Sequence, residues 1–226
     1  MGRSPTLALR ARGPLAIFTR PELKTERVSY PVMTPSAARG LLEAVLWKPA
    51  IVWRVERIKV LNEIHFTAFR RNEVNSKASL PPLKILRHGG KITSYFADDD
   101  RAQRNTVALR DVDYVVEAHF EMTPRAGNED NVNKFVDMFV RRVEKGQHFH
   151  KPYFGCRECI ADVMPADGAP PPIRATRDLG IMLWDMAYGP RANQPRFFVA
   201  RLKNGILEVP NEPEATFTTL TKGGVA

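Results

Sequence analysis

The sequence has few cysteines and no long apolar run. Only two of its 226 residues are cysteine, which excludes a disulfide scaffold and makes a reducing cytoplasm the expected location. No apolar stretch approaches the roughly 20 residues that a membrane-spanning helix needs. Arginines interrupt the apolar N-terminal stretch over 1–18, which argues against a secretory signal. We therefore expect a cytoplasmic protein without a membrane partner.

Acidic side chains are also in deficit. The chain carries 34 lysines and arginines against 25 acidic residues, which gives a net charge of +9 and a pI near 9.8. No carboxylates are grouped at a spacing typical of a metal site, so no metal or other cofactor is predicted. The basic residues cluster in "FRRNEV" (69–74), "RRVEKG" (141–146) and "RATR" (174–177). Clustering favours a polyanionic partner, nucleic acid first, over scattered solvated charge.

The stretch "HFHKPYFGCREC" (148–159) has three possible interpretations: a zinc site, a redox pair, or a strand. Zinc needs four converging ligands, yet Cys156 and Cys159 would point to opposite faces of a strand. A thioredoxin-like pair would open a helix after a strand, which this pattern does not do. The favoured interpretation is a strand over 152–163 with one buried thiol, preceded by a basic loop that carries His148 and His150.

Apolar periodicity predicts two helices. Over 34–49, Thr34 can cap the helix and Pro35 fits its first turn, and Lys48-Pro49 ends it. Over 131–146, apolar residues recur at helical spacing and Gly146 ends the pattern.

Alternating patterns predict strands over 7–19, 50–61 and 111–122. The apolar phase shifts between Val55 and Ile58, which indicates a bulge. The stretch 111–122 alternates apolar residues with a polar face that carries His119. The polar, basic segment 62–110 between two strands is either an extended hairpin or a mobile loop.

The C-terminal part is expected to form a separate small sheet. A linker over 164–172 precedes strands at 180–188, 196–205 and 206–210, and the tail 221–226 is expected to be disordered. The order up to 163 is strand, helix, strand, strand, helix, strand. This order predicts an α+β protein: a ferredoxin-like βαββαβ domain over 1–165 with an insertion at 62–110, then a small antiparallel β-sheet over 166–226. The aromatic signature of a standard RNA-recognition motif is absent.

Four segments resemble a known family: "SYPVMTPSAARGLLEAVLWKPAIVWRVERIKVL", "FRRNEV", "LRDVDYVVEAHFEM" and "PYFGCREC". In order and spacing they resemble the Cas5d (type I-C, Dvulg) family of CRISPR-associated proteins over nearly the whole chain. The resemblance implies a RAMP-type ferredoxin-like fold and a metal-independent endoribonuclease that cuts precursor CRISPR RNA at the repeat hairpin. It also implies that the protein holds the 5′ handle inside a type I-C surveillance complex with other subunits.

The family assigns catalysis to a tyrosine, a lysine and a histidine, of which this sequence keeps one. The tyrosine position matches Leu46, the lysine matches Lys134 and the histidine matches Phe135. Three hypotheses follow from this departure. Lys134 acts with a different base and acid; or Lys134 and in-line geometry alone give slow cleavage; or the chain is an inactive nuclease that only binds the handle. The replacement candidates for the first hypothesis are His119, His148, His150, Tyr114 and Tyr153.

Basic residues supply the candidate RNA contacts. Under the resemblance Lys48 lies beside the cleavage centre, and the clustered cations are candidate phosphate contacts: Arg70, Arg71, Arg141, Arg142 and Lys145. Each of these could instead be solvated surface. The net charge leaves double-stranded DNA open as an alternative partner.

Overall fold

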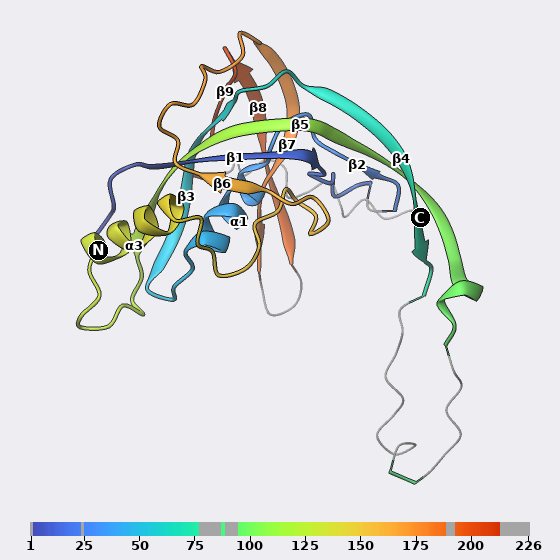
Figure 1. Ribbon diagram of the computed structural model, residues 1–226, viewed down its shortest axis with the longest axis horizontal. Coiled ribbons are helices and arrows are strands. Elements are labelled where there is room, and N and C mark those ends of the chain that lie inside the picture. Colours follow the sequence, from blue (N-terminus) through green and yellow to red (C-terminus); the bar gives the residue numbers. More distant parts are fainter. Residues whose placement is uncertain (1, 24, 77–86, 89–94, 189–192, 213–226) are drawn as a thin grey trace, which may run out of the picture.

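The described residues form one curved β-sheet with two α-helices beside it (Figure 1). A computed structural model describes residues 2–23, 25–76, 87–88, 95–188 and 193–212. Within these ranges the strands are β1 (Leu7–Ala16), β2 (Arg27–Val28), β3 (Ile51–Val60), β4 (His65–Val74), β5 (Arg101–Met122), β6 (Asp162–Met164), β7 (Arg177–Ala187), β8 (Gln194–Lys203) and β9 (Ile206–Glu208). The helices are α1 (Pro35–Val45), α3 (Val132–Glu144) and the short 3-10 helix η1 (Ala97–Asp100). The mixed α and β composition predicted from the sequence is confirmed.

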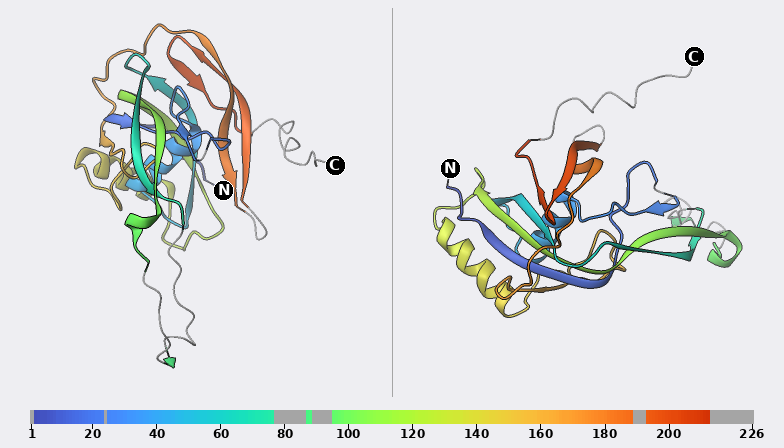
Figure 2. Two further views of the ribbon diagram at one scale, coloured as in Figure 1. Left: turned by 90° about the vertical axis from the view of Figure 1, so that its right-hand side faces the viewer. Right: turned by 90° about the horizontal axis from the view of Figure 1, so that it is seen from above.

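The main path of the sheet runs β6-β1-β5-β3-β9-β8-β7. Neighbours along this path are antiparallel, and the short β2 adds a parallel pairing to β5. The predicted C-terminal strands are present as β7, β8 and β9. Because β9 pairs with β3 at Arg57, Ile58 and Lys59, these strands continue the same sheet. In Figure 2 (left), α1 lies between α3 and the β7–β8 hairpin, and it contacts both.

The longest strand, β5, belongs to two parts of the molecule. Its residues 101–110 pair with β4 along their whole length, and also with β2 and the end of β1. This part forms an arm that extends away from α3 (Figure 1), while the later residues of β5 pair with β1 and β3. The hairpin alternative for 62–110 is therefore confirmed where the chain is described; 77–86 and 89–94 lie outside the described residues. The strand begins at Arg101 rather than at residue 111. At the junction Asp111 adopts a left-handed φ of 53°, an uncommon conformation for a residue with a side chain.

Helix α1 follows its predicted start but ends early. The Thr34 hydroxyl accepts a hydrogen bond from the Ala37 N–H at 3.3 Å, as expected of a cap. The helix ends at Val45 rather than at 49, because Leu46 is already extended (φ −142°). The chain must turn there to enter β3. Trp47 and Lys48 therefore lie on a loop and not on the helix.

Helix α3 matches its prediction closely. The Asn131 side chain accepts a hydrogen bond from the Lys134 N–H at 2.9 Å and caps the first turn. Phe135, Phe139 and Val143 recur at intervals of four residues and are buried. Gly146, at a φ of 61°, follows the last turn as predicted.

Aromatic side chains join the helices to the sheet. Trp53 on β3 packs edge-on against Phe120 of β5 at 5.4 Å between ring centroids, and against Phe139 of α3 at 4.9 Å. Phe135 packs edge-on against Phe120 at 6.3 Å. Because these rings come from three elements, they fix the position of α3 against β3 and β5.

The predicted strand over 152–163 is wrong. A turn occupies this segment, and pairing with β1 is confined to β6. Gly155 adopts a φ of 76°, and a Cβ atom there would lie 2.1 Å from the Ile17 carbonyl oxygen. The Cys159 N–H closes the turn on the Cys156 carbonyl at 2.9 Å. Because a strand cannot continue through this left-handed glycine conformation, the predicted strand does not form here.

The thiol prediction holds, since Cys159 is buried and Cys156 is partly exposed. Burial, together with its neighbour Cys156, raises the pKa of the Cys159 thiol to about 11. Among the described residues no three histidine, cysteine or acidic side chains gather as metal ligands would.

The predicted bulge in β3 is confirmed between Val55 and Arg57. Residues 165–176 contain no helix or strand, as expected of a linker. The tail 221–226 lies outside the described residues. No helix in the described ranges has the length and apolarity needed to cross a bilayer.

Candidate functional site

The C-terminal end of α1 is held by contacts from three other segments. The Phe149 N–H donates to the Ala44 carbonyl at 2.7 Å, and the Arg142 guanidinium donates to the Val45 carbonyl at 2.6 Å. These bonds satisfy carbonyl groups that an α-helix leaves free at its end. They also tie the loop after α3 to the end of α1.

Leu46, the first residue after α1, is held by a side chain of β3. The Trp53 indole N–H donates to the Leu46 carbonyl at 2.9 Å. The Thr123 hydroxyl donates to the Pro49 carbonyl at 2.6 Å, which ties the same loop to the end of β5. The segment 46–50 is therefore anchored at both ends, and it presents Trp47 and Lys48 between its anchors.

One lysine pairs with Asp130, and a second, Lys48, lies on a loop that is tied at Pro49 to Thr123 on the segment leading to Asp130. Lys134, on the first turn of α3, places its Nζ atom 3.0 Å from Oδ1 of Asp130, and its side chain is 42% exposed. Oδ2 of Asp130 accepts the Gly127 N–H at 3.0 Å. That hydrogen bond, the bond from Lys134 and the charges of Lys134 and Lys48 lower the pKa of Asp130. The site thus combines two cations with an ionised proton acceptor at the protein surface.

The two positions that the sequence resemblance matches to a tyrosine and a histidine belong to the core. Leu46 is fully buried, and Phe135 is buried against Phe120. The Lys134 ammonium lies 5.8 Å from the Phe135 ring centroid. Neither hydrocarbon side chain can transfer a proton, so any base or acid must come from other residues.

His148, His150 and Tyr153 lie on the loop that follows α3. Both histidines are exposed and Tyr153 is half-buried, with 6.1 Å between the ring centroids of His150 and Tyr153. At a rise of about 1.5 Å per residue, the ten residues from Lys134 to Glu144 separate the ends of α3 by about 15 Å. The histidine loop and the lysine pair are therefore at opposite ends of α3.

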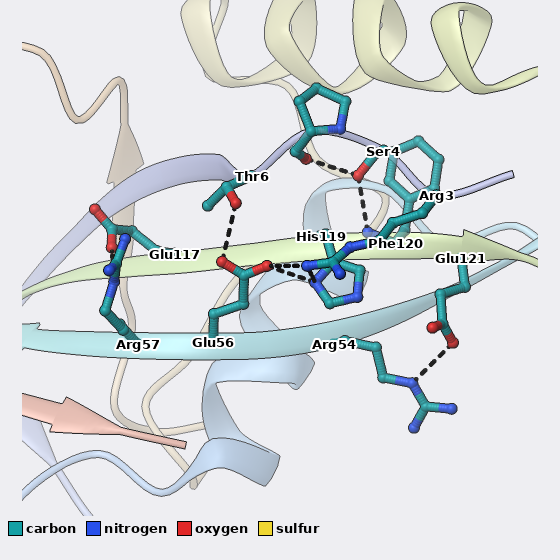
Figure 3. A network of polar contacts seen from close by, with 11 residues as sticks. Arg3, Ser4, Thr6, Arg54, Glu56, Arg57, Glu117, His119, Phe120 and Glu121 are labelled. Carbon is teal, nitrogen blue, oxygen red and sulfur yellow. Dashed lines mark hydrogen bonds and ion pairs between the residues drawn. The ribbon is translucent and has the colours of Figure 1, made fainter. Parts of the chain in front are cut away.

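His119 does not lie on a solvated face, which corrects one interpretation of its strand. It is only 4% exposed, and its Nδ1 atom lies 2.6 Å from Oε1 of Glu56 and 3.3 Å from the Arg3 guanidinium (Figure 3). Burial opposes ionisation of Glu56, but hydrogen bonds from Thr6, His119 and Arg3 lower its pKa. The imidazole ring is thus bound to groups of its own chain.

Tyr114 is also internal. Its ring packs edge-on against Phe18 at 6.2 Å and against Phe154 at 6.0 Å between centroids. Burial raises the pKa of its hydroxyl well above the ordinary value. Of the five replacement candidates, the structure brings only His148, His150 and Tyr153 to a common surface.

The predicted RNA contacts fall into two separate groups. Arg70 is exposed on the arm, while the Arg71 guanidinium lies 2.7 Å from the Glu73 carboxylate. Arg141 and Lys145 are exposed on the last turns of α3 and beside it, next to Arg142, which is bound to the end of α1. The arm points away from α3 (Figure 1), so the two groups do not form one patch.

A cleft of about 820 Å³ lies between α1, the first half of β3 and the β7–β8 hairpin. Its charges compensate one another within the protein. Arg39 makes two hydrogen bonds of 2.8 Å to Asp185 and one of 2.6 Å to Glu43, and Arg54 pairs with Glu121 at 3.2 Å (Figure 3). This cleft therefore offers a polyanion less uncompensated charge than the Lys48–Lys134 surface.

Sequence reasoning missed Asp130, Trp47 and Phe149. Asp130 precedes Lys134 by four residues, the spacing of a helical ion pair, and this spacing could have identified it. Trp47 lies off the apolar stripe of α1, which is a signal of exposure. Phe149 carries no such signal, because only the fold shows which way its loop faces.

Comparison with known proteins gives one consistent family. The family model of Cas5d, described as CRISPR-associated protein (Cas_Cas5), matches residues 6–210. The chain is 45% identical to the CRISPR pre-crRNA endoribonuclease Cas5d of Mannheimia succiniciproducens, over 88% of this chain and 92% of that protein. It is 40% identical to the protein of the same name from Thermus thermophilus, over 96% of each. A crystal structure of a CRISPR-associated protein superposes with a TM-score of 0.67 at 24% identity, over 93% of this chain and 94% of that one.

Proposed function

Because this chain belongs to the Cas5d family of CRISPR-associated proteins, we propose that it is an endoribonuclease that cuts precursor CRISPR RNA at the repeat hairpin. The observation that carries the proposal to a site is the ion pair of Lys134 with Asp130 beside the loop that carries Lys48. The two lysines come from different segments that are joined through Pro49 and Thr123, and a phosphate bound at this edge could contact both. Lys134 is also the residue that matches the family's catalytic lysine.

The reaction proceeds by attack of the ribose 2′-oxygen on the adjacent phosphorus. The O2′–P bond forms as the P–O5′ bond breaks, which leaves a 2′,3′-cyclic phosphate and a free 5′-hydroxyl. Asp130 accepts the 2′-hydroxyl proton, and the Lys48 ammonium donates a proton to the departing 5′-oxygen. Lys134 stabilises the charge that builds up on the phosphorane oxygens. These residues supply the base, the acid and the cation, so the step requires no metal.

Asp130 as the base leads to a specific pH dependence. Its pKa lies below the ordinary value, so the carboxylate is ionised throughout neutral pH and is lost only as the pH falls through that lowered pKa. We expect the single-turnover rate to change less than about twofold between pH 5 and pH 8. Asp130→Asn should lower that rate about a hundredfold, whereas Asp137→Asn, further along α3, should leave it unchanged.

A histidine base would give a different profile. The rate would then fall about tenfold per pH unit below roughly pH 6.5. His148→Ala or His150→Ala would remove most of the activity, and Asp130→Asn would not. These three results together would assign the role of general base to His148 or His150 on the loop after α3, two of the candidates from the sequence.

The activity itself is tested with a labelled repeat-hairpin RNA in EDTA. We expect cleavage at one position, a product that ends in a cyclic phosphate, and the same rate with and without the chelator. A substrate with a single 2′-deoxy sugar at the cut site should resist cleavage. Activity that disappears in EDTA and returns with magnesium would contradict the metal-independent mechanism. Binding without cleavage would leave the chain as an RNA-handle-binding subunit.

The proposed role continues after cleavage. The protein retains the 5′ handle and joins other subunits in a type I-C surveillance complex in the cytoplasm. The exposed cations of α3 and the arm, separated as described, suit contacts at two places along a bound RNA. Double-stranded DNA serves as the competitor in the binding experiment. Displacement of the hairpin RNA by an equal amount of duplex DNA would favour DNA as the partner instead.

The proposal extends to the architecture. Residues 1–165 form a ferredoxin-like unit with the arm inserted at 62–110, and 166–226 form a small C-terminal β-sheet unit. The order β6-β1-β5-β3 with antiparallel neighbours supports the first unit, because it is the order that a βαββαβ chain gives. The antiparallel pairing of β7, β8 and β9 supports the second, which joins the first through the pairing of β9 with β3.

A further inference from the structure

Two large aromatic side chains are exposed at the loops that flank the lysine pair and the histidines. Trp47 is 55% exposed and Phe149 is 77% exposed. Both lie on loops whose backbones are fixed by hydrogen bonds, so their exposure does not come from a loosely held terminus. Exposed apolar groups on a rigid, basic surface indicate a binding site.

The contacts around the end of α1 place Trp47 between the two groups of candidate residues. On one side, Arg142 binds the Val45 carbonyl and the Phe149 loop binds Ala44. On the other side, the Pro49 carbonyl next to Lys48 accepts the Thr123 hydroxyl, on the segment that leads to Asp130. A polymer that contacts both this side and the Phe149 loop therefore spans the loop that carries Trp47.

We propose that Trp47 and Phe149 form a stacking platform for unpaired bases of the RNA strand beside the scissile phosphate. The inference rests on the proposed function and adds to it the residues that set the position of the cut. A base presents a flat π-face to an aromatic ring while its phosphate meets a nearby cation. Cations lie close to both rings along the chain: Lys48 follows Trp47 directly, and Lys145 and Lys151 lie within four residues of Phe149.

The occupant is single-stranded RNA rather than a paired stem. Bases in a duplex stack on one another, so they have no free face for Trp47, whereas unpaired bases beside a hairpin do. An apolar protein surface would also cover the two rings, but it would bring hydrocarbon against a basic rim. Stacking at Trp47 fixes which phosphate reaches Lys48 and Lys134, because the intervening backbone has a fixed length.

The experiment uses Trp47 as its own reporter. Trp53 is buried and Trp184 is half-buried with its indole N–H bound to the Pro210 carbonyl at 2.9 Å, so an unpaired RNA oligonucleotide should quench chiefly Trp47. Trp47→Leu keeps an apolar side chain without a π-face. We expect it to abolish the quenching, to weaken oligonucleotide binding about tenfold by anisotropy, and to spread cleavage of the hairpin over several positions. Trp47→Phe should restore a single position.

Tyr188→Leu is the matched control, since Tyr188 is 72% exposed just beyond the end of β7, and it should keep wild-type binding and cleavage position. Trp47→Leu with unchanged RNA affinity and an unchanged cut site would overturn the inference. If that variant instead lost binding to another protein subunit, the surface would be a protein docking site. A wild-type chain that binds RNA through Trp47 without cutting contradicts the proposed function and leaves the platform standing.

Discussion

Replacing Lys134 with alanine is expected to slow cleavage of the repeat hairpin about a hundredfold or more under single-turnover conditions. The ammonium is needed most when negative charge builds up on the phosphorane, and loss of one such stabilising donor costs about 2–4 kcal/mol of barrier. Affinity for the uncut hairpin should fall far less, because Lys134 is one of many cations that face the RNA. The rate constant and the dissociation constant, measured on the same labelled hairpin, separate the two effects.

Lys134→Arg keeps the charge but changes its reach and shape, so partial recovery of the rate is expected. Lys203→Ala is the matched control, since it removes an exposed lysine at the end of β8 and should leave the cleavage rate unchanged. A wild-type rate in Lys134→Ala would remove Lys134 from the reaction. Equal slowing in Lys203→Ala would show that general charge, and not this lysine, is what matters.

The second large effect concerns stability. Trp53→Ala should lower the free energy of unfolding by about 3–5 kcal/mol, because the indole is buried between Phe120 and Phe139. The substitution also leaves the Leu46 carbonyl without its hydrogen-bond donor inside the protein. The change is measured as a shift in the urea midpoint at constant slope.

Trp47 supplies the control for size and residue type. It lies six positions away on the neighbouring loop and is largely exposed, so Trp47→Ala should change the free energy of unfolding by less than about 0.5 kcal/mol. Similar losses for the two tryptophans would mean that the exposed ring also packs in the folded protein. That result would weaken both the stability argument and the stacking platform.

Local patterns predicted the elements whose residues carry their own signals. The i, i+4 spacing of Phe135 and Phe139 and the glycine at position 146 identify α3 and its end without any knowledge of its surroundings. The phase shift in β3 identifies its bulge for the same reason. The turn at Gly155 was missed because its left-handed φ goes with close packing against the Ile17 carbonyl, and Ile17 is distant in sequence.

The candidate site was predictable only in part. The family resemblance identified Lys134, and the ion pair with Asp130 follows from a spacing of four residues. The burial of His119 could not be foreseen, because its partners Arg3 and Glu56 come from segments far away in the chain and meet it only across the sheet. The exposure of Trp47 depends on where α1 ends, and helix ends are the least predictable feature of a sequence.

Strand β5 fixes the distance between the arm and the body of the molecule. Strand β5 runs as 22 residues from Arg101 in the arm to Met122, a contour of about 70 Å. Because β4 pairs with β5 from Arg101 to Arg110, bending the arm against the body strains that pairing. Asp111, whose φ is 53°, lies between the arm and the body. A bound chain that contacts both the arm and the body is therefore held with a fixed distance between its two points of contact.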